Sequence, residues 1–596
     1  MQTDHAGKVF RRHPASKILF LLLIAAAIFT LPYFAPVHQA VSTAYVAGFN
    51  NRVAVLLMLG GTALFAFFTR GELARMEDAD RRLSIAVLLG SLALVLVACL
   101  ARIHHVPMGS RVDESLFFLN RLQLVRAGYV PYRQFDIPYG PLMLYPALWI
   151  TRALNLSVAQ GYAVWWTIQW LVGTAMMWAV VRWVDFPVRW RTAVYILLFA
   201  LELVGLRTGG SNYTPFRAYT AAFLIFVAWR VWRRWGNPWL LVLASVLAVT
   251  IATLFSMEQA VGVEFGLGCY LFLLALMRKV KFSWAAFAVY VVGCVLSYKL
   301  AEWLGLFISF KAWAAGGLSN PVLPSPAVAL GLLAYVAAGC LLIRRLMDGR
   351  FDSAVIPLTT AGCAMMSSVL GRVDMQHIYA AMPAFVVGVA ALGAMPAVWR
   401  WWFPLAALTI IVAPVLLNSP RARQHLGFPA DPEPAAQTLP HAPGARPVVL
   451  ETYPELNFVS KDFPCDRKYF MPSMAPSPLE AFRPQCQESG YFFGMGDVIT
   501  AVGIEMKLDE LRERPNMPLV MHNVPIEEEF RPDQTDLSGL RAQELAPWVP
   551  RLRNPPLTFQ PMIDYIREHY TPGAVIVDGR FRIWEPRGAA TTPAPR

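Results

Sequence analysis

The stretch PWLLVLASVLAVTIATLFSMEQAVGVEFGLGCYLFLLALMRKVK, residues 238–281, contains the pattern that decides the fold. Two apolar segments, 238–255 and 260–277, are separated by a short turn around Glu258, and the second segment ends in the basic group RKVK. About 20 apolar residues cross the hydrocarbon core of a bilayer as a helix, which satisfies its own backbone hydrogen bonds in lipid. The stretch therefore predicts two neighbouring membrane-spanning helices.

The same pattern recurs along most of the chain. Of its 596 residues, 56% are hydrophobic and 15% are charged, whereas soluble globular domains average about 45–50% and about 25%. We expect an α-helical polytopic membrane protein with about 13 transmembrane helices, near 17–36, 53–69, 83–101, 159–181, 192–207, 217–232, 238–255, 260–277, 283–303, 326–343, 355–371, 378–398 and 402–418.

The net charge of +13 follows membrane topology and not a nucleic-acid-binding surface. Alternate short loops are rich in arginine and lysine, which marks the cytoplasmic side. With a cytoplasmic N-terminus, an odd number of spans places the chain after 418 outside, and we expect a multi-pass protein of the plasma (inner) membrane. Residues from Asn418 onward contain 19 Lys and Arg against 23 Asp and Glu, so the predicted membrane region carries +17.

The C-terminal region has a different composition. We expect a proline-rich linker over 419–446 and an extracytoplasmic α/β domain over 447–596, with strands at 447–451 and 518–522, a helix over 497–514 and a hairpin around Asp578-Gly579. Cys465 and Cys486 are the cysteines of this region. They are a candidate disulfide if the compartment is oxidising, and two free buried thiols otherwise.

The segment 102–158 lies between the predicted N-terminal helices (1–101) and the predicted transmembrane core (159–418), and we expect it outside. Residues 115–126 have the spacing of an amphipathic helix at the membrane interface. Asp113 and Glu114 stand directly before it. A carboxylate there is a candidate general base for an acceptor hydroxyl, and the alternative is an N-terminal cap of the helix.

Asp113-Glu114 and the following run NRLQLVRAGYVPYRQFDIPYGPL, residues 120–142, resemble the GT-C superfamily of membrane glycosyltransferases. The similarity is to the branch with protein O-mannosyltransferases and aminoarabinose transferases. In those relatives the acidic loop commonly follows the first span, whereas here it follows the third predicted span. Two additional N-terminal helices would preserve the sidedness.

This resemblance implies a glycosyltransferase of the cell envelope. A hexose or pentose would move from a polyprenyl-phosphate donor to a hydroxyl of an envelope glycan, lipid or protein on the extracytoplasmic face, with inversion. The resemblance assigns Asp113 the role of general base, with Glu114 beside it. In such a reaction the departing phosphate needs cations to stabilise its negative charge. The partners are thus a lipid-linked sugar, the acceptor and membrane lipid, with no nucleic acid.

Candidate cations gather on the predicted outer face. GRVDMQH, residues 371–377, looks like a late-span motif of the superfamily, and Arg372 and His377 are candidates for binding the donor phosphate. A snorkelling Arg372 paired with Asp374 is the alternative. Arg207 and Arg217 flank the loop TGGSNYTPF and form a second cationic pair.

Glu258 completes the candidate catalytic carboxylates, because its turn lies on the predicted outer face; the alternative is a cap of the helix that follows. Tyr132, Tyr139 and Asp374 are candidates for acceptor or sugar binding. No metal ligand is assigned, and the question of a divalent cation held by Asp113, Glu114 and Glu258 stays open. The rival function is a transporter or flippase of a lipid-linked or envelope glycan precursor, which would favour internal repeats and charges near the midplane.

Overall fold

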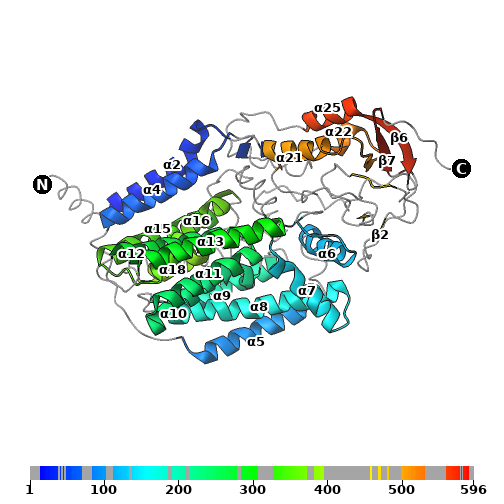
Figure 1. Ribbon diagram of the computed structural model, residues 1–596. Coiled ribbons are helices and arrows are strands. Elements are labelled where there is room, and N and C mark those ends of the chain that lie inside the picture. Colours follow the sequence, from blue (N-terminus) through cyan, green and yellow to red (C-terminus); the bar gives the residue numbers. More distant parts are fainter. Residues whose placement is uncertain are drawn as a thin grey trace, which may run out of the picture.

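A computed structural model shows that the protein is mainly helical (Figure 1). It describes residues 14–37, 40–41, 44–45, 48–69, 83–102, 112–132, 137, 139–185, 191–208, 214–277, 283–306, 326–371, 382–394, 457–458, 467–470, 480–481, 499–530, 559–576, 579 and 581–588. The predicted span at 402–418, the predicted linker, the predicted strand at 447–451 and the candidate disulfide Cys465–Cys486 lie outside these residues.

Helices dominate the chain as far as residue 394. Their bounds are α2 (Pro14–Thr30), η1 (Leu31–Phe34), α4 (Asn51–Thr69), α5 (Ile85–Arg102), α6 (Val112–Arg126), α7 (Pro141–Ala153), α8 (Val158–Trp183), α9 (Arg191–Thr208), α10 (Pro215–Trp235), α11 (Pro238–Phe255), α12 (Met257–Met277), α13 (Trp284–Leu304), α15 (Pro326–Met347), α16 (Val355–Gly371) and α18 (Met382–Ala394). A described helix overlaps each predicted span from 17–36 to 378–398. The segment 102–158, predicted as an outside loop, contains α6 and α7.

Within the described residues, five helices are long and apolar enough to cross a membrane: Asn51–Phe68 of α4, then α8, α11, α12 and α13. Shorter apolar helical stretches occur at Leu19–Phe34, Ile85–Ala101, Val355–Met366 and Pro383–Leu392. Length and composition are thus those of a multi-pass helical membrane protein. The number of thirteen spans remains a prediction.

Apolar side chains cover the outer faces of several of these helices. In α13, Val292 is 57% exposed, Leu296 63% and Trp303 71%, and α5 and α11 expose leucines in the same way. A water-soluble bundle would have polar residues on such faces, because an exposed apolar area of this extent is costly in water. In a bilayer the same faces contact lipid tails.

Helices α12 and α16 pack closely because glycines face the contact. A Cβ at Gly266 would lie 2.5 Å from the carbonyl oxygen of Pro357, and a Cβ at Gly262 would lie 2.5 Å from Sδ of Met365. Small residues allow this approach in membrane proteins, where van der Waals contact drives helix association. The pairing of residue 262 with 365 and of 266 with 357 makes the two helices antiparallel.

Helix α10 connects two polar clusters at opposite ends of the bundle. It begins after the capping residue Thr214 and ends at Trp235, where Gly236, with a φ of 59°, caps the helix. Arg217 lies in its first turn and Arg233 in its last, about 24 Å apart at 1.5 Å per residue. We call the cluster of Tyr139, Arg217 and Glu258 the Arg217 end, and the cluster around Asp352 the Asp352 end.

The C-terminal elements form a small mixed unit. They are β4 (Ile499–Thr500), α21 (Ala501–Arg512), β5 (Leu519–His522), α22 (Ile526–Glu529), α25 (Gln560–His569), β6 (Tyr570–Ile576) and β7 (Phe581–Pro586). The antiparallel sheet has the order β5-β7-β6, and Leu519, Leu508 and Ile566 contribute to the core beneath it. The predicted hairpin around Asp578-Gly579 is confirmed, because Ile576 pairs with Phe581 and Gly579 has a φ of 85°.

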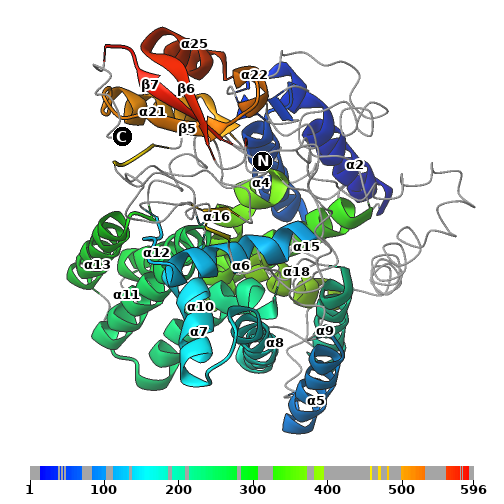
Figure 2. The ribbon, with the colours of Figure 1, turned by 90° about the vertical axis from the view of Figure 1, so that its right-hand side faces the viewer.

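Two short strands link this unit to the N-terminal helices. β1 (Ala40–Val41), between α2 and α4, pairs antiparallel with β4, directly before α21. Figures 1 and 2 show the C-terminal elements beside α2 and α4, and Figure 2 shows α6 running across the ends of the bundle helices. The connection between α2 and α4 therefore lies on the same side of the protein as the C-terminal elements.

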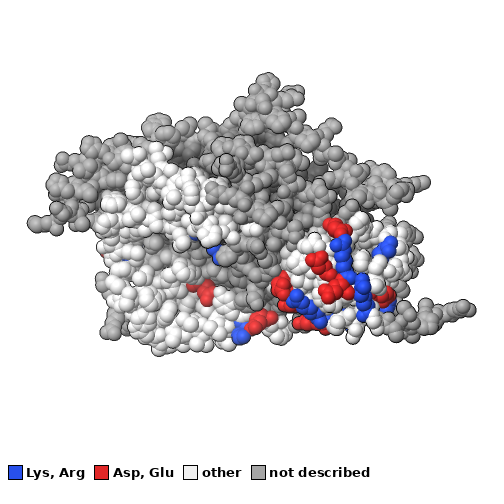
Figure 3. All heavy atoms as spheres, turned by 90° about the horizontal axis from the view of Figure 1, so that it is seen from above, with Lys and Arg blue, Asp and Glu red and all other residues white. Residues whose placement is uncertain are grey.

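Charge separates the two parts of the surface. In Figure 3 the acidic and basic side chains gather on the C-terminal elements, whereas the described helical part is almost uncharged in that view. The pairs Arg512–Glu505, Arg512–Asp509 and Arg467–Glu585 belong to this charged part. A charged C-terminal unit suits water, and an uncharged bundle suits lipid.

Packing of α12 against α16 gives a first testable prediction. Gly266→Ala should lower the free energy of unfolding by about 1–3 kcal/mol, because its methyl group would overlap Pro357 and Ala361. Gly268 is the matched control on the same helix, where a Cβ meets Tyr290 at an ordinary 3.5 Å. Denaturant unfolding in detergent micelles would measure both variants, and equal effects would contradict the close packing.

Candidate functional site

Three side chains from distant parts of the chain meet at the Arg217 end. Cζ of Arg217 lies 4.7 Å from the ring centre of Tyr139, and its Nη2 lies 4.0 Å from Oε2 of Glu258. The Arg217 side chain is 10% exposed and that of Glu258 is 25% exposed. The guanidinium is therefore largely withdrawn from solvent, between an aromatic face and a carboxylate.

Helix caps place the two charged residues. Thr214 is the N-cap of α10; its hydroxyl accepts from the Arg217 backbone N–H and donates to Oε1 of Gln169 at 2.9 Å. Pro215 then starts the helix, as proline does well at the first position. Glu258 lies in the first turn of α12, where a carboxylate is stabilised by the helix dipole. The capping alternative for Glu258 is thus compatible with its contact to Arg217.

Tyr139 is held by the backbone on both sides. The Gly140 N–H donates to the carbonyl of Phe255 at 2.8 Å, and a Cβ at Gly140 would lie 2.1 Å from the carbonyl oxygen of Leu254. The Tyr132 hydroxyl donates to the Tyr139 carbonyl at 2.7 Å. Gly140 is therefore required for the chain to dock on the end of α11, and this docking sets the ring over Arg217.

An aromatic stack extends the site to α6 and α8. Phe118 of α6 stacks on Tyr139 with ring centres 5.3 Å apart. The same ring also stacks on Tyr162 of α8, with ring centres 5.8 Å apart. Such offset stacks contribute about 0.5–1.5 kcal/mol beyond burial. The stack joins the loop that carries the sequence motif to the core of the bundle.

The predicted acidic pair lies on α6, the helix that contributes Phe118 to this stack. Asp113 and Glu114 occupy the first turn of α6, and Asp113 precedes Phe118 by about 7.5 Å along the helix axis. Their side chains lie outside the described part of the structure. The same holds for the side chain of Arg207, near the C-terminal end of α9.

The predicted phosphate motif follows a helix that reaches the same end. α16 ends at Gly371, and its antiparallel contact with α12 brings that terminus toward Glu258. Arg372, Asp374 and His377 come next in the sequence and lie outside the described residues. Of the candidate site residues, the structure therefore brings together Arg217, Glu258, Tyr132 and Tyr139.

The side chains at the Arg217 end are suited to bind a ligand that carries both an anionic group and an uncharged polar group. Arginine provides a planar fork for phosphate or carboxylate oxygens, and a withdrawn position strengthens such contacts. The 4.0 Å separation from Glu258 exceeds hydrogen-bond length. In the described part of the chain, no group of three or more histidine, cysteine, aspartate or glutamate side chains is arranged to hold a metal ion.

Sequence reasoning missed several polar and aromatic residues of this end. Gln169 and Gln259 are buried at 2% and 1% exposure, and Phe118 and Tyr162 form the stack. The two glutamines could have been identified from their position inside apolar segments, because an amide group in lipid needs a hydrogen-bond partner. For the aromatic residues, core packing and ligand binding have the same sequence signature.

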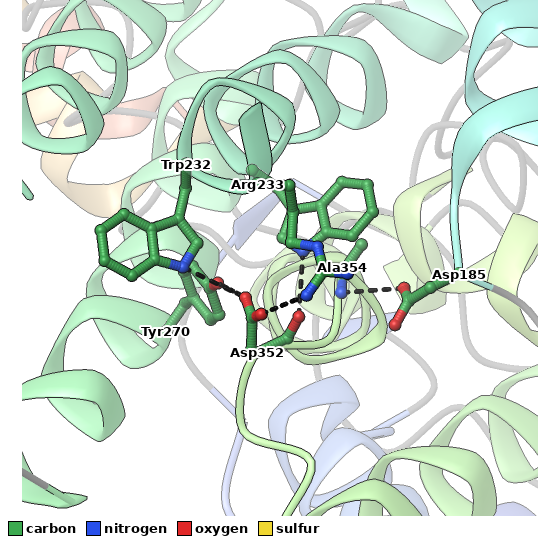
Figure 4. A network of polar contacts seen from close by, with 7 residues as sticks. Asp185, Trp232, Arg233, Tyr270, Asp352 and Ala354 are labelled. Atoms are coloured by element: carbon green, nitrogen blue, oxygen red, sulfur yellow. Dashed lines mark hydrogen bonds and ion pairs between the residues drawn. The ribbon is translucent and has the colours of Figure 1, made fainter. Parts of the chain in front are cut away.

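A second polar cluster occupies the Asp352 end (Figure 4). One carboxylate oxygen of Asp352 accepts from the Trp232 indole and the Tyr270 hydroxyl, each at 3.1 Å, and the other pairs with Arg233. The Asp352 carbonyl accepts from Trp229 at 3.2 Å. These mutual contacts tie the connection between α15 and α16 to α10 and α12, which is a structural role.

Asp185 extends the Asp352 end to α8. Its Oδ1 accepts from the Ala354 N–H at 3.0 Å, and its carbonyl accepts from Arg345 at 2.9 Å. Desolvation raises the pKa of Asp185 above its usual value, and the Ser353 hydroxyl and the Arg345 charge oppose that rise only in part. The ionised form is thus disfavoured relative to the unfolded chain.

No protein-family model, curated protein or solved structure matches this chain.

The raised pKa of Asp185 leads to a pH-dependent prediction. A raised folded-state pKa means that the folded state binds the proton more tightly, so this stabilisation is lost as pH rises through that pKa. Asp185→Asn keeps an acceptor for Ala354 and should become more stable relative to wild type as pH rises from about 4 to 8. Asp352→Asn should instead be modestly destabilised at neutral pH, since the half-exposed Arg233 loses its charged partner. Thermal unfolding across this pH range would test both variants; a constant difference between Asp185→Asn and wild type contradicts the assignment.

Proposed function

We propose that the protein is an integral-membrane glycosyltransferase that moves a sugar from a polyprenyl-phosphate donor to a hydroxyl acceptor at the Arg217 end. The observation that carries the proposal is the largely withdrawn Arg217, held over Tyr139 and next to Glu258 at the end of an apolar bundle. A lipid-linked donor arrives within the membrane plane, and its phosphate needs a cation at helix ends. The resemblance of the acidic loop supports the same chemistry.

Arg217 acts on the donor phosphate. A guanidinium withdrawn from water binds phosphate oxygens more strongly than an exposed one, because the local dielectric is lower. As the glycosidic bond breaks, negative charge grows on the phosphate, and a cation fixed beforehand stabilises it without reorganisation. Arg372 and His377, which follow α16, and Arg207, at the end of α9, are proposed as further phosphate ligands.

Asp113 takes the acceptor proton. The acceptor oxygen forms a bond to the anomeric carbon from the face opposite the phosphate, the carbon–oxygen bond to the phosphate breaks, and polyprenyl phosphate leaves with the electron pair. The hydroxyl proton passes to Asp113. Glu258 and Glu114 orient the acceptor or a divalent cation, and Tyr132, Tyr139 and Asp374 border the sugar. Inversion at the anomeric carbon follows from this single displacement.

The finer architecture belongs to the same proposal. It comprises thirteen spans, an extracytoplasmic C-terminal α/β domain and an active site that opens on the outer face of the plasma membrane. The pairing of β1 with β4 supports a shared side for the connection between α2 and α4 and the C-terminal elements. Cysteine labelling of these two regions in intact cells would establish their sidedness.

Asp113→Asn provides the central test of catalysis. It should insert and fold as wild type but lower transfer by about 10²–10⁴-fold, the usual contribution of a general base. Mass spectrometry of cell-envelope glycans would compare cells without the protein, complemented by wild type, Asp113→Asn or the exposed-surface control Asp509→Asn. Normal glycans with Asp113→Asn remove that residue from catalysis. A lipid-linked sugar moved across proteoliposomes without a covalent product would favour the transporter instead.

Arg217 allows a test of phosphate binding. Arg217→Ala should lower kcat/KM by about 10²–10³-fold, because a charge-stabilising donor is lost. Arg217→Lys should retain part of the activity, since the charge remains while the planar fork and its stacking on Tyr139 are lost. Arg52→Lys, at the N-terminal end of α4, is the matched control. Full activity of Arg217→Ala would refute the assigned role.

A further inference from the structure

A buried amide lies directly beside the Arg217 end. Gln259 follows Glu258 on α12 and is 1% exposed. Its Oε1 accepts from the Ala221 backbone N–H of α10 at 3.2 Å. Ala221 lies one helical turn, about 6 Å, deeper along α10 than Arg217. The amide is therefore fixed between α10 and α12, beside the turn of α10 that follows Arg217.

The contact with Ala221 determines which way the amide faces. Only the oxygen of a glutamine can accept from an N–H group, so the nitrogen Nε2 must point away from Ala221. This Nε2 is buried and has no hydrogen-bond partner among the described residues. A buried donor without a partner costs about 1–3 kcal/mol, and such groups in a native protein usually meet a water or a ligand.

We propose that Gln259 is a specificity-determining residue whose Nε2 donates a hydrogen bond to a hydroxyl of the sugar on the lipid-linked donor. The inference rests on the proposed function and deepens it. Arg217 holds the phosphate, and the group bonded directly to that phosphate is the sugar, which the one-turn spacing places at the amide. Glu258, 25% exposed and 4.0 Å from Arg217, is the more accessible of the two charged groups of the site.

An amide donor selects for hydroxyl groups more strongly than an apolar pocket does. A site built to hydrogen-bond a hydroxyl rejects an analogue that lacks it, because the buried donor is then left without a partner. Polyprenyl phosphate without a sugar is such an analogue. Wild type should therefore bind the sugar-loaded lipid more tightly than the bare lipid phosphate, and the difference should depend on Gln259.

The experiment measures ligand-dependent Tm of the full-length protein in detergent. The probes are polyprenyl phosphate and polyprenyl phosphate carrying glucose, mannose, galactose or arabinose. The variants are Gln259→Met, which removes the amide at similar size, and Gln259→Asn, which keeps it on a shorter side chain. The control is Ser245→Ala, because Ser245 Oγ of α11 is likewise buried without a partner among the described residues but lies about 15 Å along α11 from Phe255.

Gln259→Met should weaken binding of the preferred sugar-loaded lipid about 5- to 100-fold and leave the Kd of bare polyprenyl phosphate unchanged. Gln259→Asn should show a smaller loss, and Ser245→Ala none. If wild type prefers one sugar-loaded lipid and Gln259→Met keeps that preference, the inference is overturned while the proposed function stands. If wild type binds polyprenyl phosphate but shows no preference for any sugar, the inference also fails alone. If wild type binds none of the probes, the proposed function fails with it.

Discussion

The close antiparallel contact of α12 with α16 is the interaction on which both ends of the bundle depend. Glycines at 262 and 266 leave room for the α16 backbone, and without that approach the two helices would separate along their length. α12 carries Glu258 and Gln259 at one end and Tyr270, a donor to Asp352, toward the other. The same contact therefore positions the residues that α12 contributes to the candidate site and to the cluster opposite it.

The two ends differ in how their polar groups are satisfied. At the Asp352 end, one carboxylate gathers Trp232, Arg233 and Tyr270, and the protein itself supplies the partners. At the Arg217 end, by contrast, the buried amide nitrogen of Gln259 has no hydrogen-bond partner among the described residues. Closed networks stabilise a fold, whereas a polar group that awaits a partner is typical of a binding site.

The sequence predicted the helices well and the site in part. Hydropathy located helices as far as 378–398, and the turn Asp578-Gly579 located a hairpin, because both signals are local. It also selected Arg217 and Tyr139 as separate candidates. It gave no sign that they touch, since their contact depends on Gly140 docking on the end of α11. Gln259 was missed because a single amide within an apolar run has no periodic signature.

By itself, the sequence determined that the chain forms apolar helices with charges at their ends, because a helix satisfies its backbone internally and charge is excluded from lipid. The tertiary structure alone decided which ends meet. Close backbone contacts, such as that of Gly140 with the end of α11, brought Tyr139, Arg217 and Glu258 from three separate segments to one place. The physical reason is that hydropathy acts on each segment independently, whereas a site requires specific distances between segments.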